Sequence, residues 1–509
     1  MEKMKYKISS RATILLGRES VSKVESALIE LIKNTYDADA TMCYILFDVE
    51  NDSILLIDDG SGMTKKIIED NWMMIGTDNK KKEYISKKKR IKSGEKGIGR
   101  FALDRLGGVC ELFTKSQEEH ATIRWKTNWN SFEEEGNLLE DIEAEFEYVS
   151  LSLYELIPDT VKNKIIQLEH RIEKKIDFST GTIIKISNLR DEWTNNQIER
   201  IKKSMEFLIP PKEQDEFYIC QQKSIDSGYE LIENNFSDEF DYKIKSVFDG
   251  ENFMINLYRN EFDVDKIPEN VFREERFMRY PYRKEDFKVK CLEFTYSISQ
   301  LFNTSDSEYI ERIKQIGSFT FEYIFMKLQN QKKEVFFYKE IGKTRNEWLE
   351  EHGGIKIYRD NFWVRPYGEN GSDSFDWLGL EARNNANPVA VSSKTEAWTV
   401  RNAQGQGTVF ISRINNASIL DKSSREGIIE NESFKLLKDA LIRIISILEK
   451  DRAYIARSFK IYDDRVNHKE KTKQEGSQIA KSCIFRKNCA SVPEERSAIP
   501  LQTEQSSAG

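Results

Sequence analysis

The first 110 residues alternate apolar and polar positions in a way that predicts a helix, a strand pair and a second, shorter helix. Residues 22–40 repeat apolar side chains at helical spacing, which predicts an amphipathic helix. Residues 41–49 and 53–57 are rich in β-branched and apolar residues and flank a polar turn, the pattern of paired strands. The run 100–106 predicts a short amphipathic helix that two glycines close.

The rest of the chain predicts a second set of strands and helices. A helix over residues 194–212 is expected to end where two consecutive prolines break it. Residues 355–358 and 362–365 predict a hairpin, and residues 431–452 predict a strongly periodic helix. Further strands are predicted at residues 243–247, 253–258, 319–327, 334–338 and 409–414.

Composition divides the chain into residues 1–215, residues 216–455 and a polar tail over residues 456–509. A chain of 509 residues is long enough for two or three domains with their own cores. The tail contains few large apolar residues, so we expect it to be disordered.

Charge and cysteine content narrow the class of protein. The formal net charge is −8, which argues against a generally basic nucleic-acid surface and leaves only a local patch. No run approaches the ~18 apolar residues of a membrane span, and no signal peptide is visible, so we expect no membrane partner and a cytoplasmic location. The six cysteines include no C-x-x-C pair, and with four histidines they support neither a disulfide framework nor a zinc site.

Three short acidic or glycine-rich motifs follow one another in the first 100 residues. The first contains Glu30, Asn34 and Asp37, which lie at i, i+4 and i+7 and share one face of the predicted helix. The amide oxygen of Asn34 suits Mg²⁺, a hard cation that prefers oxygen ligands. The carboxylate of Glu30 can take a proton from an attacking water. On its own, an E-x-x-x-N motif more often marks a solvated helix face. A nucleotide site is therefore predicted only if the other two motifs also fit one.

The second motif, Asp58-Asp59-Gly60-Ser61-Gly62-Met63, ends the second predicted strand. A carboxylate there can accept a hydrogen bond from the amine of adenine, and glycines let the backbone approach the base. In isolation, the same residues are also an ordinary Asp/Gly turn.

The third motif, Gly94-Glu95-Lys96-Gly97-Ile98-Gly99-Arg100, opens the second predicted helix. Free N–H groups and the positive end of the dipole at a helix start bind phosphate. The order differs from the G-x-G-x-x-G of dinucleotide-binding folds, and the chain contains no P-loop sequence. The three motifs in this order therefore predict an ATP pocket.

The ordered set resembles the GHKL superfamily, which includes DNA gyrase B subunits, the ninety-kilodalton heat-shock chaperone, sensor histidine kinases, MutL and the MORC proteins. The resemblance covers residues 10–190 and 350–450. It implies an α+β fold, in which an N-terminal Bergerat α/β sandwich with a mixed, mostly antiparallel sheet precedes a transducer-like domain. It makes Glu30 the catalytic base, Asn34 the Mg²⁺ ligand and Asp58 the acid that reads adenine. The other nucleotide contacts that it implies are Asp37, Gly60, Gly62, Met63, Gly94, Lys96, Gly97, Ile98, Gly99, Arg100 and Thr182.

Residues 76–93 correspond to the lid that folds over ATP in this superfamily, and they carry two lysine-rich runs. Clustered lysines can supply salt-dependent contacts to nucleic acid. Runs of like charge more often stay hydrated, however, and no aromatic residues are interleaved with these lysines. We therefore favour a mobile, solvated lid over a nucleic-acid contact.

Residues 420–426 resemble the Ser-Arg-Glu element of the heat-shock chaperone, whose arginine reaches the γ-phosphate from a second domain. Ser423 and Glu426 have the capping-box form, which predicts that Arg425 lies in the first turn of the next helix. A guanidinium stays charged and grips phosphate oxygens in pairs. Lys422 is the rival, because gyrase and MutL use a lysine from the equivalent domain. The alternative role for Arg425 is a surface ion pair.

The resemblance implies an ATPase that binds ATP and Mg²⁺, closes its lid, forms an ATP-dependent homodimer and clamps a macromolecule. The client is DNA or protein, and the sequence does not decide between them. Two alternatives are a nucleotide-gated scaffold without hydrolysis and a protein histidine kinase. A kinase needs a phospho-acceptor histidine on a dimerising helix, a context that none of the four histidines has in the sequence.

Overall fold

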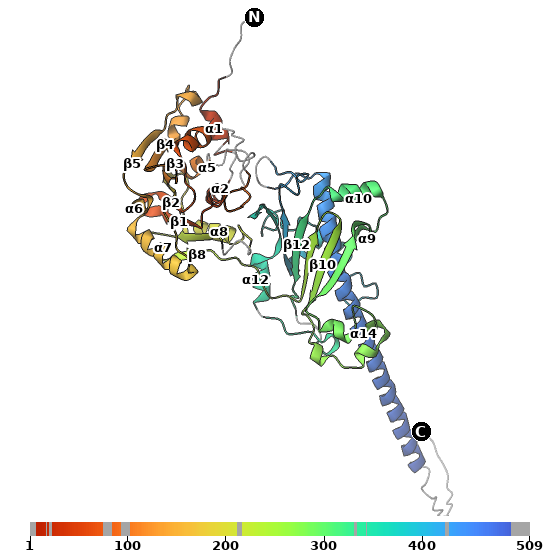
Figure 1. The fold of residues 1–509 in the computed structure, drawn as a ribbon. Helices are drawn as coiled ribbons and strands as arrows, with labels where there is room; N and C mark the ends of the chain where they lie inside the picture. Colours follow the sequence, from red (N-terminus) through yellow and green to blue (C-terminus); the bar gives the residue numbers. More distant parts are fainter. Residues whose placement is uncertain are drawn as a thin grey trace, which may run out of the picture.

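The computed structural model describes residues 7–16, 18–19, 23–74, 84–92, 102–210, 216–329, 333–342, 344–422 and 427–489. These residues form two domains, each built on one sheet, and the long helix α14 continues beyond the second domain (Figure 1). Both domains mix helices with a mostly antiparallel sheet, so the predicted α+β class is confirmed.

The described part of the first domain contains an eight-stranded sheet in the order β5-β4-β3-β6-β2-β1-β7-β8. Strands β1 and β7 pair in parallel, and every other neighbouring pair in this sheet is antiparallel. The strands are β1 (Met42–Asp48), β2 (Ser53–Asp58), β3 (Gly107–Lys115), β4 (Thr122–Asn128), β5 (Glu145–Val149), β6 (Gly181–Leu189), β7 (Tyr218–Gln222) and β8 (Tyr229–Leu231).

Helices cover both faces of this sheet. Cys43, Ile45 and Phe47 of β1 belong to the core under helices α2, α5 and α8, whereas Tyr44 and Leu46 belong to the core under α6 and α7. Alternate residues of a strand point to opposite faces, so a strand buried on both faces reads as one apolar run. The helices are α1 (Arg11–Leu16), α2 (Val24–Asp37), α3 (Lys65–Ile67), α5 (Ala102–Leu106), α6 (Leu153–Leu156), α7 (Asp159–Ile172) and α8 (Asn195–Glu206).

The second domain contains a seven-stranded sheet in the order β11-β10-β9-β12-β15-β13-β14. Helix α14 packs along it through the apolar residues that the sequence predicts on one side, among them Phe434, Leu441 and Leu448, all fully buried. The strands are β9 (Tyr242–Phe248), β10 (Asn252–Arg259), β11 (Leu292–Ser297), β12 (Phe319–Phe325), β13 (Gly354–Arg359), β14 (Phe362–Trp363) and β15 (Gly405–Ile411). The helices are α9 (Ile298–Phe302), α10 (Ser307–Lys314), α11 (Lys333–Phe336), α12 (Arg345–His352), α13 (Leu380–Ala386) and α14 (Glu432–Cys489).

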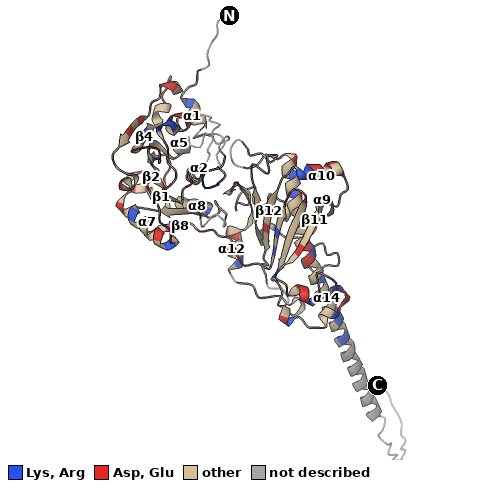
Figure 2. Cartoon of the chain, viewed as in Figure 1, with Lys and Arg blue, Asp and Glu red and all other residues tan. Residues whose placement is uncertain are grey.

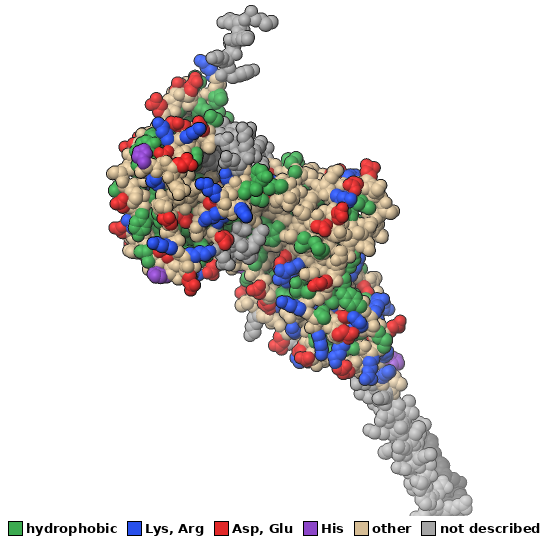
Figure 3. Space-filling view, viewed as in Figure 1, with side chains coloured by type: hydrophobic (Ala, Val, Ile, Leu, Met, Phe, Trp, Pro, Cys, Tyr) green, Lys and Arg blue, Asp and Glu red, His purple; other side chains and the backbone are tan. Residues whose placement is uncertain are grey.

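Charged residues of both signs are interspersed over both domains (Figure 2). The face seen in Figure 3 likewise carries no large patch of a single sign. None of the described helices is long and apolar enough to cross a membrane.

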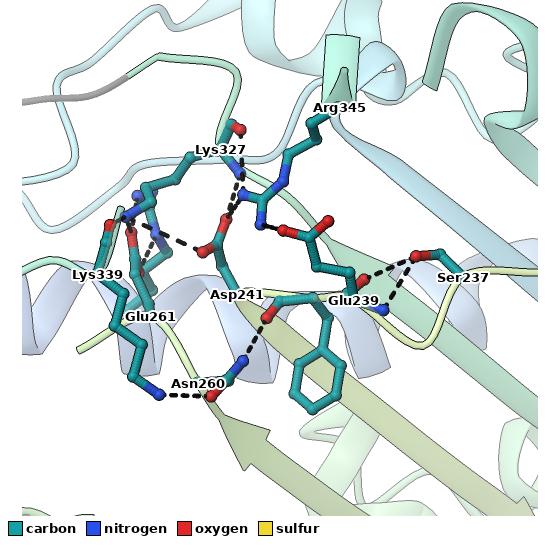
Figure 4. Close-up of polar contacts among 10 residues, drawn as sticks. Ser237, Glu239, Asp241, Asn260, Glu261, Lys327, Lys339 and Arg345 are labelled. Atoms are coloured by element: carbon teal, nitrogen blue, oxygen red, sulfur yellow. Dashed lines mark hydrogen bonds and ion pairs between the residues drawn. The ribbon is translucent and has the colours of Figure 1, made fainter. Parts of the chain in front are cut away.

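A buried network of charges supports the second domain at the end of strand β12 (Figure 4). Asp241 Oδ2 accepts hydrogen bonds from Lys327 N (2.5 Å) and Arg345 Nη1 (2.7 Å). Glu261, which is fully buried, accepts two hydrogen bonds from Arg452 of α14, at 2.8 and 2.7 Å. Removing Arg452 would take both of these hydrogen bonds from the buried Glu261, so this pair helps to fix helix α14 to the rest of the domain.

The structure differs from the sequence predictions at three places. Residues 334–338 are predicted as a strand but begin in helix α11, because a short apolar run fits a buried helical turn as well as a strand. Strands β7 and β8 complete the first sheet beyond the predicted boundary at residue 215. The tail predicted to be disordered from residue 456 is helical as far as Cys489, and its lysine, glutamate and glutamine residues favour a helix.

The β13–β14 hairpin docks the second domain on the first. Phe362 lies in the first-domain core, with its ring 5.0 Å from that of Tyr36 at the end of helix α2. Asn361 Nδ2 donates to Tyr36 Oη at 3.3 Å, and Tyr358 Oη donates to Phe207 O at 2.7 Å. The hairpin therefore contacts the helix that carries Glu30.

Lys356 of β13 is buried where the two domains meet. Its Nζ donates to His352 O (3.2 Å) and Gly353 O (3.1 Å) and lies 4.0 Å from the centre of the Phe207 ring. Burial lowers the pKa of this ammonium to about 7, a shift that the charge of Glu369 opposes. The folded protein therefore gives up this proton near neutral pH, whereas the unfolded chain keeps it.

We expect Lys356 to make the folded protein more stable as the pH rises above 7. Between pH 7 and 9 the unfolded state binds more protons than the folded state, so the free energy of unfolding increases with pH. Relative to Lys356→Met, the wild type should gain about 2 kcal/mol over this interval in urea unfolding. The exposed Lys66→Met is the matched control and should follow the wild type. Parallel curves for wild type and Lys356→Met would contradict the prediction.

Candidate active site

Helix α2 presents Glu30 and Asn34 on the side opposite the first-domain core. Leu28 and Leu31 are buried, whereas the Glu30 side chain is 16 % exposed, with its Oε1 3.2 Å from Lys33 Nζ. Asn34 is half-buried. Asp37, predicted on the same face, is buried. The expected helix and its two faces are thus present, with Asp37 deeper than the sequence suggests.

Asp58 ends strand β2 inside the first domain. The residue is 4 % exposed, and its Oδ1 accepts a hydrogen bond from Gly60 N at 2.9 Å. Burial raises the pKa of this carboxyl to about 7, against the lowering effect of the Gly60 hydrogen bond. Its neighbour Asp59 has a different task, since its Oδ1 accepts from Thr41 N (2.7 Å) and Met42 N (2.8 Å) and anchors the start of β1.

Gly62 is required by the packing of its own loop. It has φ +63°, and a Cβ there would lie 2.0 Å from Lys115 O of strand β3. Ser61 N donates to Ala38 O at 2.8 Å, which ties the loop to the end of helix α2. The sequence predicts that the glycines let the backbone approach the adenine base. The structure shows that Gly62 is also required because a side chain there would clash with Lys115 O.

Thr114 of strand β3 joins the second motif to Thr182, one of the predicted nucleotide contacts. Its hydroxyl accepts from Met63 N at 2.9 Å, donates to Gly181 O at 3.0 Å and lies 3.1 Å from Thr182 Oγ1. Thr182 in turn pairs with Asp58 across strands β6 and β2. Sequence reasoning missed Thr114, because only the strand register brings it here.

A cavity of about 390 Å³ lies between the domains, and one predicted site residue of each domain lines it. Glu30 and Lys33 of the first domain line it together with Arg359 and Lys422 of the second. Arg359 donates to Asp421 Oδ1 and to Ile419 O, both at 2.7 Å, and so holds the segment that carries Lys422. Glu30 and Lys422 therefore line the same cavity, whereas their roles in hydrolysis stay predictions.

Residues 420–422 and 427–429 are joined by backbone hydrogen bonds and lie before helix α14. Lys422 N donates to Gly427 O at 3.0 Å, and Ile429 N donates to Leu420 O at 2.7 Å. Helix α14 starts at Glu432, where Asn431 Oδ1 accepts from Phe434 N at 3.0 Å. The prediction that Ser423 and Glu426 cap the next helix, with Arg425 in its first turn, is wrong for α14. A local S-x-x-E pattern cannot show that Asn431 supplies the cap instead.

Part of the predicted lid is held in place by one buried arginine. Arg90 lies 4.3 Å from the Tyr36 ring and donates to Ala40 O and Glu216 O, both at 2.7 Å. Lys87 is exposed, as a solvated lid predicts, but Arg90 is 6 % exposed. The expectation of a hydrated lid therefore fails at Arg90, because aromatic rings and carbonyl groups compensate its burial.

The same segment also contacts the second domain. Arg413 Nη2 donates to Lys92 O at 2.5 Å. Arg413 also lines the cavity that contains Glu30. Residues 84–92 therefore touch helix α2 through Arg90 and the second domain through Lys92.

The third motif and Arg425 lie outside the described residues. The predictions affected are Gly94, Lys96, Gly97, Ile98, Gly99, Arg100 and Arg425. Their roles stay predictions, and so do the catalytic, metal-binding and nucleotide-binding roles of the described site residues Glu30, Asn34, Asp37, Asp58, Gly60, Gly62, Met63, Thr182 and Lys422.

A comparison with known families supports the assignment of the first domain. Residues 21–156 match the family described as histidine kinase-, DNA gyrase B-, and HSP90-like ATPase. This segment includes the first two motifs and the whole third motif. No curated protein matches the chain. Residues 21–156, which include helix α2 and the Asp58 loop, therefore carry an ATPase-type domain of the GHKL superfamily.

Proposed function

We propose that this protein hydrolyses ATP with Glu30 as the base and that its second domain completes the catalytic pocket. The observation that carries the proposal is the shared cavity, in which Glu30 and Lys422 come from different domains. Glu30 would take the proton from the attacking water, and Lys422 or Arg425 would stabilise the charge that develops on the phosphate. Such positioning and charge stabilisation account for most of the catalysis of phosphoryl transfer.

The residues of the first domain fit ATP and Mg²⁺. Burial raises the pKa of the Asp58 carboxyl, and a hydrogen bond donated by the amine of adenine would favour its ionised form. Asn34 would hold Mg²⁺ through its amide oxygen, with phosphate oxygens and water as the remaining ligands. Bound Mg²⁺ would neutralise charge on the phosphates. Lys33, paired with Glu30, would keep that carboxylate turned toward the cavity.

We further propose that ATP drives closure and dimerisation of a clamp that acts on DNA or protein. Two contacts support this proposal: Arg413 binds the backbone of residues 84–92, and Phe362 packs against helix α2. If nucleotide binding shifts residues 84–92 or helix α2, the second domain should move with them, because closely packed contacts do not deform freely.

We expect Lys422→Ala and Arg425→Ala to separate hydrolysis from binding. Removal of the residue that contacts the phosphate should lower kcat about 100-fold and leave the Kd for ATP within about threefold. Lys435→Ala, an exposed lysine on helix α14, is the matched control and should retain the wild-type rate. Full activity of both single variants and of the double variant would exclude completion of the pocket by these residues. Light scattering with a non-hydrolysable ATP analogue tests the dimer in the same samples.

The fate of the phosphate distinguishes the two other functions. A non-hydrolysing scaffold would release no phosphate in a single turnover. A histidine kinase would transfer it to protein as an acid-labile adduct, and His468, exposed on helix α14, is the residue to test for it. Free phosphate formed in proportion to protein supports the ATPase.

A further inference from the structure

We propose that a second cavity of the first domain binds an organic cation, a quaternary or methylated ammonium group, against tryptophan rings. The cavity has a volume of about 210 Å³ and is lined by Trp72, Trp125 and Trp129 with Phe132. This volume is well above the ~30 Å³ that one water occupies.

The rings come from three elements that hold them at different angles. Trp72 ends a π-helix, Ile68–Trp72, and its ring lies 6.0 Å from that of Trp125 of β4 at an interplanar angle of 89°. Trp129 and Phe132 lie on one 3₁₀ turn, with ring centres 5.1 Å apart. A π-helical turn is rare and often occurs at functional sites. Perpendicular aromatic walls of this kind can surround a rounded cation.

The polarity of the lining favours a cation over an anion. The indole nitrogens of Trp72 and Trp125 are buried without a hydrogen-bond partner, so these rings offer carbon rather than N–H to the cavity. The charged residues among its lining are Glu140 and Glu143, both exposed, and the described lining contains no lysine, arginine or histidine. The negative ring faces and the two carboxylates attract the same sign of charge.

This cavity is separate from the cavity between the domains. Its lining contains neither Glu30 nor Asp58. Leu103 of helix α5, however, lines it just after the third motif, and Trp72 follows Met63 in the chain. Because the two cavities share none of these residues, cation binding does not depend on the proposed hydrolysis and can be measured without nucleotide.

The test is calorimetric titration of the full chain with choline and with 3,3-dimethylbutan-1-ol, its neutral isostere. Because the two differ mainly in charge, we expect choline to bind about tenfold more tightly or better. Equal affinity would show an apolar cavity only and overturn the proposal, and so would the absence of choline binding. Peptides with trimethyllysine or unmodified lysine at one position then show whether a small molecule or a protein supplies the group.

Two pairs of variants locate the binding. Trp72→Leu keeps an apolar side chain without a π face and should weaken choline binding about tenfold, whereas Trp72→Phe should weaken it only about threefold. Glu140→Gln with Glu143→Gln alters exposed residues alone and should weaken choline but not the alcohol. Choline binding that is unchanged in Trp72→Leu and in the double glutamine variant would place the cation elsewhere and overturn the proposal.

Discussion

Glu30→Gln is expected to abolish ATP hydrolysis while the protein still binds ATP. The substitution keeps the size of the side chain but removes its ability to accept a proton, and a positioned base contributes about 10²–10⁴-fold. The Kd for ATP should change little, because we assign the binding of ATP to Asp58, Asn34 and the third motif. Phosphate release at saturating ATP measures the rate, and fluorescence titration with a labelled nucleotide measures the affinity.

Glu25→Gln provides the matched control for this variant. Glu25 lies on the same helix, is 7 % exposed and pairs with Arg200 at 3.2 Å rather than facing the cavity between the domains. Its loss should lower stability and leave kcat near the wild-type value. If Glu30→Gln hydrolyses ATP at the wild-type rate, Glu30 is not the base. A Glu30→Gln protein that binds but does not hydrolyse ATP would also be suited to trapping the closed clamp with its client.

The sequence predicted those parts of the fold and the site that depend on local spacing. The apolar period placed helix α2 and put Glu30 and Asn34 on its outer side, and the β-rich run placed Asp58 at the end of a strand. These features depend on residues a few positions apart, which one amphipathic pattern relates. The packing of Leu28 and Leu31 beneath Glu30 follows from the same pattern.

Contacts that depend on strand register or domain docking could not be predicted in this way. Thr114 reaches the Asp58 loop only because β3 pairs with β6 and β6 with β2. Arg359 holds Asp421 only because strand β13 and residues 419–421 lie side by side in the folded domain. Arg90 was assigned to a hydrated lid, because a lysine-rich run does not reveal the aromatic rings of Tyr36 and Phe217 that cover its guanidinium.

Asp58→Asn is expected to weaken ATP binding about 100-fold and at the same time stabilise the protein without nucleotide. In the wild type, the Asp58 carboxyl group accepts hydrogen bonds from the backbone of Gly60 and Thr182, and as an ionised group it can also accept one from the amine of adenine. Asparagine has one oxygen, so if that oxygen keeps the Gly60 bond, an amide N–H₂ group faces the adenine amine and two donors meet. Asp59→Asn is the matched control: it alters the neighbouring carboxylate that anchors β1 and should leave the affinity nearly unchanged.

The stability of Asp58→Asn relative to the wild type should depend on pH in a defined direction. The pKa of Asp58 is raised from 3.8 to about 7, so between pH 5 and 7 the unfolded chain has released this proton while the folded protein keeps it. The unfolded state then binds fewer protons, and the wild type loses stability as the pH rises, by about 2–3 kcal/mol between pH 5 and 8. Asparagine does not titrate, so the variant should gain on the wild type over this interval in urea unfolding without nucleotide. Saturating ATP should reverse the order at pH 8, because only the wild type binds it tightly. If Asp58→Asn binds ATP with wild-type affinity, Asp58 does not contact adenine. If the stabilities of the wild type and the variant change in parallel with pH, the buried charge of Asp58 does not account for the difference in stability.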